Sequence, residues 1–153
     1  MVRSRLKSAD ALKQIKEATH AQIGHRFDAD VESGAKLYLM VCGGGGCHSS
    51  GSGKLIARLT ALAARDGMQE EIAVERTGCF GLCSEGPILV VQPEGTMYTK
   101  VSEDDIDEIW ESHVKNGKIV ERLLSPHEEE FFSKQNRIAL KNCGRITYIF
   151  SKR

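Results

Sequence analysis

The sequence predicts an α/β domain in which a mixed β-sheet is flanked by helices. The predicted elements in the central part of the chain follow the order strand, helix, strand, strand, strand, helix. A helical crossover between the first two strands favours a parallel pair, because parallel neighbours need a long connection. A tight turn between the last two strands favours an antiparallel pair. A sheet with both kinds of neighbour, covered by helices, accommodates these connections.

The first predicted elements are a helix over residues 8–23 and a strand over 36–41. Ser8 is a suitable N-cap, and apolar residues of the helix recur near one face at helical spacing. These residues are Leu12, Ile15 and Ile23, with Thr19 between them. The strand is apolar on both of its faces, which is typical of a strand covered on both sides.

A glycine-rich loop follows, and then a helix over about 53–66 and a strand over 71–76. The helix has an apolar stripe expected to be buried, made of Leu55, Ile56, Leu59, Leu62 and Ala63. Gly67 suits the C-terminal end of this helix, because glycine readily adopts the left-handed conformation found there. In the strand, Ile72 and Val74 should point inward.

The last part of the domain is predicted to hold a hairpin and a helix. Strands over 88–92 and 96–101 flank the turn Pro93-Glu94-Gly95, in which proline fixes a backbone angle. Ser102 begins a pattern resembling a capping box, and the helix that follows ends near Gly117. Its inward side chains are expected to be Ile106, Ile109, Trp110 and Val114.

Composition excludes several classes of function. The 153 residues contain 21 basic and 21 acidic side chains, so no overall field attracts nucleic acid or an anionic membrane. No apolar run approaches the roughly 20 residues of a membrane span, and no secretory signal begins the chain. With five cysteines and no export signal, we expect a cytoplasmic protein whose thiols serve metals or catalysis. The acidic run 103–111 predicts a solvated face, with a docking surface as the alternative.

Four cysteines form the principal candidate site. Cys42 and Cys47 follow one predicted strand, and Cys79 and Cys83 follow another. Because loops at one end of a sheet bring distant residues together, we expect these four thiolates to converge on a metal. The glycines from 43 to 46 should turn with positive φ and direct backbone N–H groups at the sulfurs. The helix beginning near Gly53 would add its positive end to the site.

Other kinds of site compete with a two-iron cluster. Structural zinc usually takes Cys-x2-Cys pairs, and the spacings here are longer but within tolerance. A thioredoxin-type redox pair needs Cys-x-x-Cys, which does not occur. Phosphate-loop and dinucleotide patterns both fail at His48, so no nucleotide site is expected. His48 is itself predicted to lie at the surface or beside the site. The basic residues Lys54, Arg58 and Arg76 could offset the cluster charge, although plain solvent exposure explains each of them as well.

The cysteine segments resemble a known family. The stretches Cys42-Gly-Gly-Gly-Gly-Cys47 and Thr77-Gly-Cys79-Phe-Gly-Leu-Cys83-Ser-Glu-Gly-Pro87 resemble the thioredoxin-like [2Fe-2S] ferredoxin domain. More narrowly, they are similar to the copy at the N-terminus of the flavoprotein β subunit of NAD(P)-linked iron-only hydrogenases and of complex I-type NADH dehydrogenases. The resemblance implies a thioredoxin-like fold with Cys42, Cys47, Cys79 and Cys83 as ligands of a [2Fe-2S] cluster. Thioredoxin-like folds also raise the expectation of a cis Gly86–Pro87 bond above the ~5–6% of ordinary X-Pro bonds.

The resemblance divides the chain into three parts. Residues 1–34 form an N-terminal helical extension, and 35–124 form the ferredoxin domain. Residues 125–153 look like the start of a flavin- and NADH-binding domain that is truncated, with Cys143 as a spare thiol.

The function expected from this division is that of a one-electron carrier without a catalytic site of its own. Its expected partners are flavin- or iron–sulfur-containing dehydrogenase or hydrogenase subunits. The alternative is a zinc-stapled protein-interaction module without redox activity, with the acidic helix as its contact face.

Overall fold

The computed structural model describes residues 8–23, 26, 35–124, 134, 138, 143 and 144. Its helices and strands are α1 (Ala9–Ile23), β1 (Leu37–Cys42), α2 (Gly45–Ser49), α3 (Ser52–Arg65), β2 (Ile72–Thr77), β3 (Leu89–Gln92), β4 (Thr96–Tyr98) and α4 (Asp105–Ile109). Short 3₁₀ turns occupy Cys83–Glu85 and Glu121–Leu123, and a π-helical turn, Trp110–Val114, continues α4.

The sheet is mixed, as predicted. Its four strands lie in the order β2-β1-β3-β4. β1 and β2 are parallel, whereas β3 is antiparallel to both β1 and β4. The register of the parallel pair places Cys42 opposite Thr77, so that the two cysteine-bearing loops leave the sheet at the same end.

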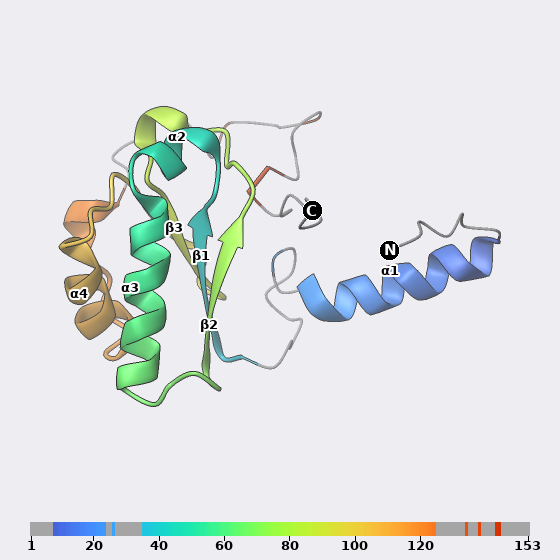
Figure 1. Ribbon diagram of the computed structural model, residues 1–153, viewed down its shortest axis with the longest axis horizontal. Coiled ribbons are helices and arrows are strands. Elements are labelled where there is room, and N and C mark those ends of the chain that lie inside the picture. Colours follow the sequence, from blue (N-terminus) through green and yellow to red (C-terminus); the bar gives the residue numbers. More distant parts are fainter. Residues whose placement is uncertain are drawn as a thin grey trace.

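Helices α3 and α4 cover one face of the sheet (Figure 1). The predicted stripe of α3 packs there, with Ile56 partly buried and the other four residues buried. Gly67, with φ of 69°, ends the helix. The Met68 N–H donates to the Ala63 carbonyl at 2.9 Å and the Gly67 N–H to the Ala64 carbonyl at 3.3 Å. This is the Schellman arrangement, and it confirms the predicted stop.

The opposite face of the sheet is apolar too. Tyr38 and Met40 of β1 are buried there with Ile88 and Val90. The other side of β1 presents Leu39 and Val41 to the core beneath α3 and α4. The prediction that this strand is covered on both sides is therefore confirmed.

The helix that begins after Ser102 is confirmed with a modified start and end. Asp105 accepts hydrogen bonds from the backbone N–H of Ser102 at 2.8 Å and from its hydroxyl at 2.6 Å. The serine hydroxyl is thus a donor here rather than the acceptor of a full capping box. At the other end, Lys115 N–H bonds to the Trp110 carbonyl at 3.1 Å, which is the wider π spacing, and Gly117 with φ of 65° ends the helix.

The hairpin is present, but its second strand is shorter than predicted. β4 ends at Tyr98 rather than at residue 101. Tyr98 pairs across to Leu124, and the Thr99 N–H donates to the Leu123 carbonyl at 2.9 Å. Lys100, with φ of 52°, turns the chain after β4, and the N–H groups of Lys100 and Val101 donate to the carbonyls of Glu85 and Pro87 rather than to β3. The Gly86–Pro87 bond is cis, as is Gln92–Pro93.

The segments outside the sheet domain are described only in part. Helix α1 is confirmed, with the Ser8 hydroxyl accepting from the Ala11 N–H at 3.1 Å, and it stands apart from the sheet (Figure 1). In the described part of the chain, no helix combines the length and the apolarity that crossing a bilayer requires. Apart from four residues, the predicted flavin-domain start lies outside the described residues and stays a prediction.

Candidate metal centre

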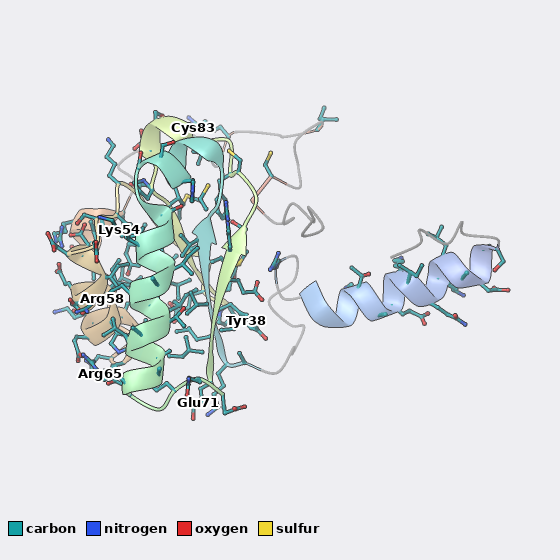
Figure 2. The ribbon with its side chains drawn as sticks, in the orientation of Figure 1. Tyr38, Lys54, Arg58, Arg65, Glu71 and Cys83 are labelled. Carbon is teal, nitrogen blue, oxygen red and sulfur yellow. The ribbon has the colours of Figure 1, made fainter. Side chains whose placement is uncertain are left out.

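The candidate site lies where β1 and β2 end side by side. Cys42 is the last residue of β1, and the Gly43 N–H donates to the Thr77 carbonyl at 3.0 Å. Because parallel strands present their carboxyl ends at the same edge, the two loops start from adjacent positions. Cys83 lies at this end of the domain, beside α2 (Figure 2).

The first cysteine pair is buried. Cys42 is 1% exposed, and Cys47, on the short helix α2, is 2% exposed. Burial, followed by the hydrogen bond with the Cys42 thiol, raises the pKa of Cys47 to about 12. A hydrogen bond from the backbone of Ile88 opposes this rise by favouring the thiolate.

The second pair lies closer to the surface. The Sγ atoms of Cys79 and Cys83 are 3.9 Å apart, and the Gly81 N–H points at the Cys79 sulfur at 3.3 Å. Cys79 is half-buried and Cys83 is exposed. The hydrogen bond with Cys79 and the repulsion between the two sulfurs raise the pKa of the Cys83 thiol.

The structure brings the two pairs together, as the spacing predicts. A methyl group added at Gly44 would lie 3.1 Å from the Cys79 sulfur, and one added at Gly46 would lie 3.8 Å from the Cys83 sulfur. The loop of the first pair therefore packs directly on the second pair. Cys42 and Cys47 also interact electrostatically with Cys83 across the two loops.

The expected role of the glycines is wrong in its detail. Gly43 to Gly46 do not adopt positive φ; the last two begin helix α2. Their small size matters instead, because a Cβ at Gly43 would lie 2.6 Å from the Thr77 carbonyl oxygen and one at Gly44 would lie 2.9 Å from Cys79 Cβ. The N–H groups that reach the sulfurs belong to Gly81 and Ile88.

Gly86 is a close neighbour of the site that the sequence analysis did not identify. A Cβ there would lie 2.6 Å from the Cys47 sulfur, so only glycine fits beside this thiol. The pair Gly86-Pro87 before a buried strand was the available indication, since glycine beside proline often marks a close backbone approach.

The donor set fits a two-iron cluster. In a [2Fe-2S] centre each iron takes two protein thiolates. Two thiolates on one tetrahedral metal, with metal–sulfur bonds near 2.3 Å, are about 3.8 Å apart, and the 3.9 Å between Cys79 and Cys83 matches this distance. Within the described ranges, no group of three His, Cys, Asp or Glu side chains is placed to hold one ion.

The basic side chains near the cysteine loops have different kinds of partner. Lys54 and Arg58 of α3 face the acidic helix, with Lys54 Nζ 3.8 Å from Glu103 and Arg58 Nη2 2.8 Å from Asp107. The acidic run is thus partly neutralised by α3. Arg76 instead donates to the Gly43 carbonyl at 3.1 Å. His48 is exposed on α2, as expected.

Comparison with known proteins identifies the family. The family model described as thioredoxin-like [2Fe-2S] ferredoxin matches residues 25–113. The chain belongs to this family. A [2Fe-2S] ferredoxin of Clostridium pasteurianum is 48% identical over 80 residues, which cover 52% of this chain and 78% of that protein.

Solved structures show the same fold. The thioredoxin-like [2Fe-2S] ferredoxin from Aquifex aeolicus superposes with a TM-score of 0.54 at 30% identity, covering 59% of this chain and 96% of that one. A chain of an NAD⁺-reducing [NiFe]-hydrogenase gives a TM-score of 0.50 at 17% identity, covering 77% of this chain and 23% of that one. The second likeness concerns the fold alone.

Membership in this family settles the cofactor and the general role. The protein is a thioredoxin-like ferredoxin whose cofactor is a [2Fe-2S] cluster, and it is an electron carrier. The zinc-stapled alternative has no support among these relatives.

Proposed function

We propose that this ferredoxin is the electron-transfer module of an NAD(P)H dehydrogenase or hydrogenase complex, and that Cys42, Cys47, Cys79 and Cys83 hold its cluster. The observation that carries the ligand assignment is the parallel register of β1 and β2, which starts both cysteine loops at one end of the sheet. The 3.9 Å sulfur separation in the second pair is the spacing that a shared iron requires.

The four cysteine side chains differ in how far they are exposed to solvent. When bound, the cluster accepts and releases one electron at a time. Cys42 and Cys47 are buried and keep water from one side, whereas Cys83 reaches the surface. A redox partner would therefore approach at the end of the domain formed by α2 and the loop of residues 79–83. The Gly81 and Ile88 N–H groups stabilise negative charge on sulfur.

The proposed partners are flavin- or iron–sulfur-containing subunits, and the proposed compartment is the reducing cytoplasm. The support is the sequence resemblance of residues 42–47 and 77–87 to the ferredoxin domain of such flavoprotein subunits. A hydrogenase chain that contains this fold is consistent with it. We place the functional domain at residues 35–124.

Substitution of single cysteines by serine tests the ligands. Each of the variants at positions 42, 47, 79 and 83 should lose or visibly alter the absorption spectrum and the EPR signal of the reduced protein. The matched control is Cys143→Ser, which removes a thiol from the tail and should change neither. Four ligand variants with an unaltered spectrum would refute the assignment.

Anaerobic isolation of the tagged full chain from its native cells tests the complex. We expect the preparation to contain flavin and additional iron, and NAD(P)H should bleach its visible absorption. The cysteine variants that lose the cluster control for bleaching of other centres. A chain isolated without flavin, and not reduced by NAD(P)H, would contradict the complex while leaving the electron carrier in place.

A further inference from the structure

The side chain of Arg76 lies directly on the first cysteine loop. Its Nη2 donates to the Gly43 carbonyl at 3.1 Å. A Cβ at Gly43 would lie 2.3 Å from Arg76 Nε and 2.8 Å from its Cγ, so the arginine occupies the space that a side chain at 43 would need. Gly43 follows Cys42 immediately. The guanidinium is therefore held one residue from a proposed ligand.

Arg76 differs from the other basic residues near this end of the domain. Lys54 is paired with Glu103 at 3.8 Å, Lys100 with Glu85 at 3.4 Å and Arg58 with Asp107 at 2.8 Å. In the described part of the chain, Arg76 has no carboxylate at ion-pair distance; its polar contact is the carbonyl of Gly43. The neighbouring acid, Glu75, pairs with Arg26.

An unneutralised positive charge matters beside a cluster that carries about −2 when oxidised and gains another negative charge on reduction. Charges and hydrogen bonds around a centre are a main control of its potential. Arg76 is exposed, and its hydrogen bond to the Gly43 carbonyl places it beside the first cysteine loop.

We propose that the positive charge of Arg76 favours the reduced cluster and so raises its reduction potential. Arg76 acts by holding one positive charge over the loop that carries Cys42. The proposal rests on the ligand assignment above. The two can fail separately, because ligand variants are judged by loss of the cluster and Arg76 variants by the potential of a cluster that is still present.

The test is a redox titration of the holoprotein, followed by EPR at low and at high salt. R76Q removes the charge and keeps a hydrogen-bond donor; we expect its reduction equilibrium constant to fall about three- to tenfold at low salt, where tenfold corresponds to 59 mV for one electron. R76K keeps the charge and should stay within about twofold of the unmodified protein. High salt should shrink the R76Q effect, since screening weakens exposed charges.

R58Q is the matched control. It removes the same positive charge from the middle of α3, farther from the end of the domain where Cys83 lies (Figure 2), and it should shift the potential less than R76Q does. An unchanged potential in R76Q would overturn the proposal, and so would equal shifts in R76Q and R76K, because these would indicate loop geometry rather than charge. Should R76Q fail to retain the cluster, R76K decides alone: a shift larger than about twofold in its equilibrium constant overturns the proposal.

Discussion

Adjacent glycines in the first cysteine loop differ in how much space surrounds them. A Cβ at Gly44 would lie 2.9 Å from Cys79 Cβ, whereas a Cβ at Gly45 meets nothing within 4 Å. The two residues are neighbours in sequence and belong to the same loop, so they form a matched pair for substitution. The contact at Gly44 brings the two cysteine loops together.

Gly44→Ala should therefore destabilise the protein and release the cluster faster. The added methyl group must displace Cys79, and overpacking of this kind typically costs about 1–3 kcal/mol. Gly45→Ala should be neutral or slightly stabilising, because alanine favours the helix that begins there. Loss of visible absorption in the presence of a chelator measures the release. Equal rates for the two variants would contradict this account of the loop.

The sequence could predict that the two cysteine loops lie close together, because each loop follows the end of a predicted strand. The reason for the glycines could not be predicted, since it depends on which side chain faces which position across two loops. Positive φ was the natural expectation for Gly43 to Gly46, and helix α2 overrides it. Gly86 likewise acquires its role only through a contact between segments distant in sequence. The sequence offered Arg76 as one of three basic residues, and only its contact with Gly43 distinguishes it from the other two.

The buried thiol of Cys47 should be unreactive in the cluster-free protein. Its pKa of about 12, against an ordinary 9.0, lowers the thiolate fraction at pH 8 about 1,000-fold. Because the pKa is raised, the thiol stays neutral up to high pH, and only its small thiolate fraction reacts. The rate of alkylation of Cys47 should therefore increase about tenfold per pH unit below pH 12. Cys83, which is exposed, should react before Cys47. Mass spectrometry after timed iodoacetamide treatment distinguishes the sites, and equal rates for Cys47 and Cys83 would count against the buried geometry.

At the scale of elements, Asp66 at the C-terminal end of α3 bonds to the π-helical turn that continues α4. Its carboxylate accepts from Arg65 at 2.7 Å and from Trp110 Nε1 at 2.8 Å, and Lys115 Nζ lies 2.8 Å away. These donors, Arg65 foremost, hold the pKa of Asp66 far below its usual range. The Asp66 side chain thus connects the C-terminal end of α3 to Trp110 and Lys115.

Asp66→Asn should lower the denaturant midpoint at pH 7. A carboxyl whose pKa is lower in the folded protein contributes stability above its unfolded pKa, near 3.9, and loses it as pH falls through the folded pKa. The difference between the two proteins should therefore narrow below about pH 4. Chemical denaturation of the cluster-free proteins in reducing buffer, at pH 7 and below pH 4, measures this difference in stability. Glu111→Gln is the control, because it removes an exposed partner of the same bases and should have little effect.

Helix α3 could be predicted almost to the residue, because its apolar stripe and its terminal glycine are local patterns. The short β4 could not, because residues 99–101 bond to Leu123, Glu85 and Pro87 rather than to β3, and these are contacts between distant segments. His113 is a further example: it is buried between the Tyr98 hydroxyl at 2.7 Å and Glu94 at 2.6 Å, and it joins α4 to the hairpin. No periodicity in the sequence indicates this link.

For the whole molecule, two contacts between described residues join the sheet domain to segments outside it. Arg26, which is buried, pairs with Glu75 of β2 at 2.5 Å. Gly144, also buried, lies against the ring of Phe80 between the second pair of cysteines. The tail therefore contacts the loop that carries Cys79 and Cys83. Cys143, next to Gly144, is half-buried at the same place.

Gly144→Val should detach this turn of the tail from the cysteine loop. A Cβ at 144 would lie 2.1 Å from Phe80 Cδ1, and φ of 80° already disfavours any side chain there. In the holoprotein the four thiols proposed as ligands would be bound to iron, so that alkylation reports on Cys143 alone; we expect it to speed up severalfold in the variant. Gly117→Val is the matched control, since it imposes the same backbone strain at φ of 65° with nothing within 4 Å. Labelling of Cys143 at the same rate in Gly144→Val as in the control would show that the tail does not rest on Phe80 in solution.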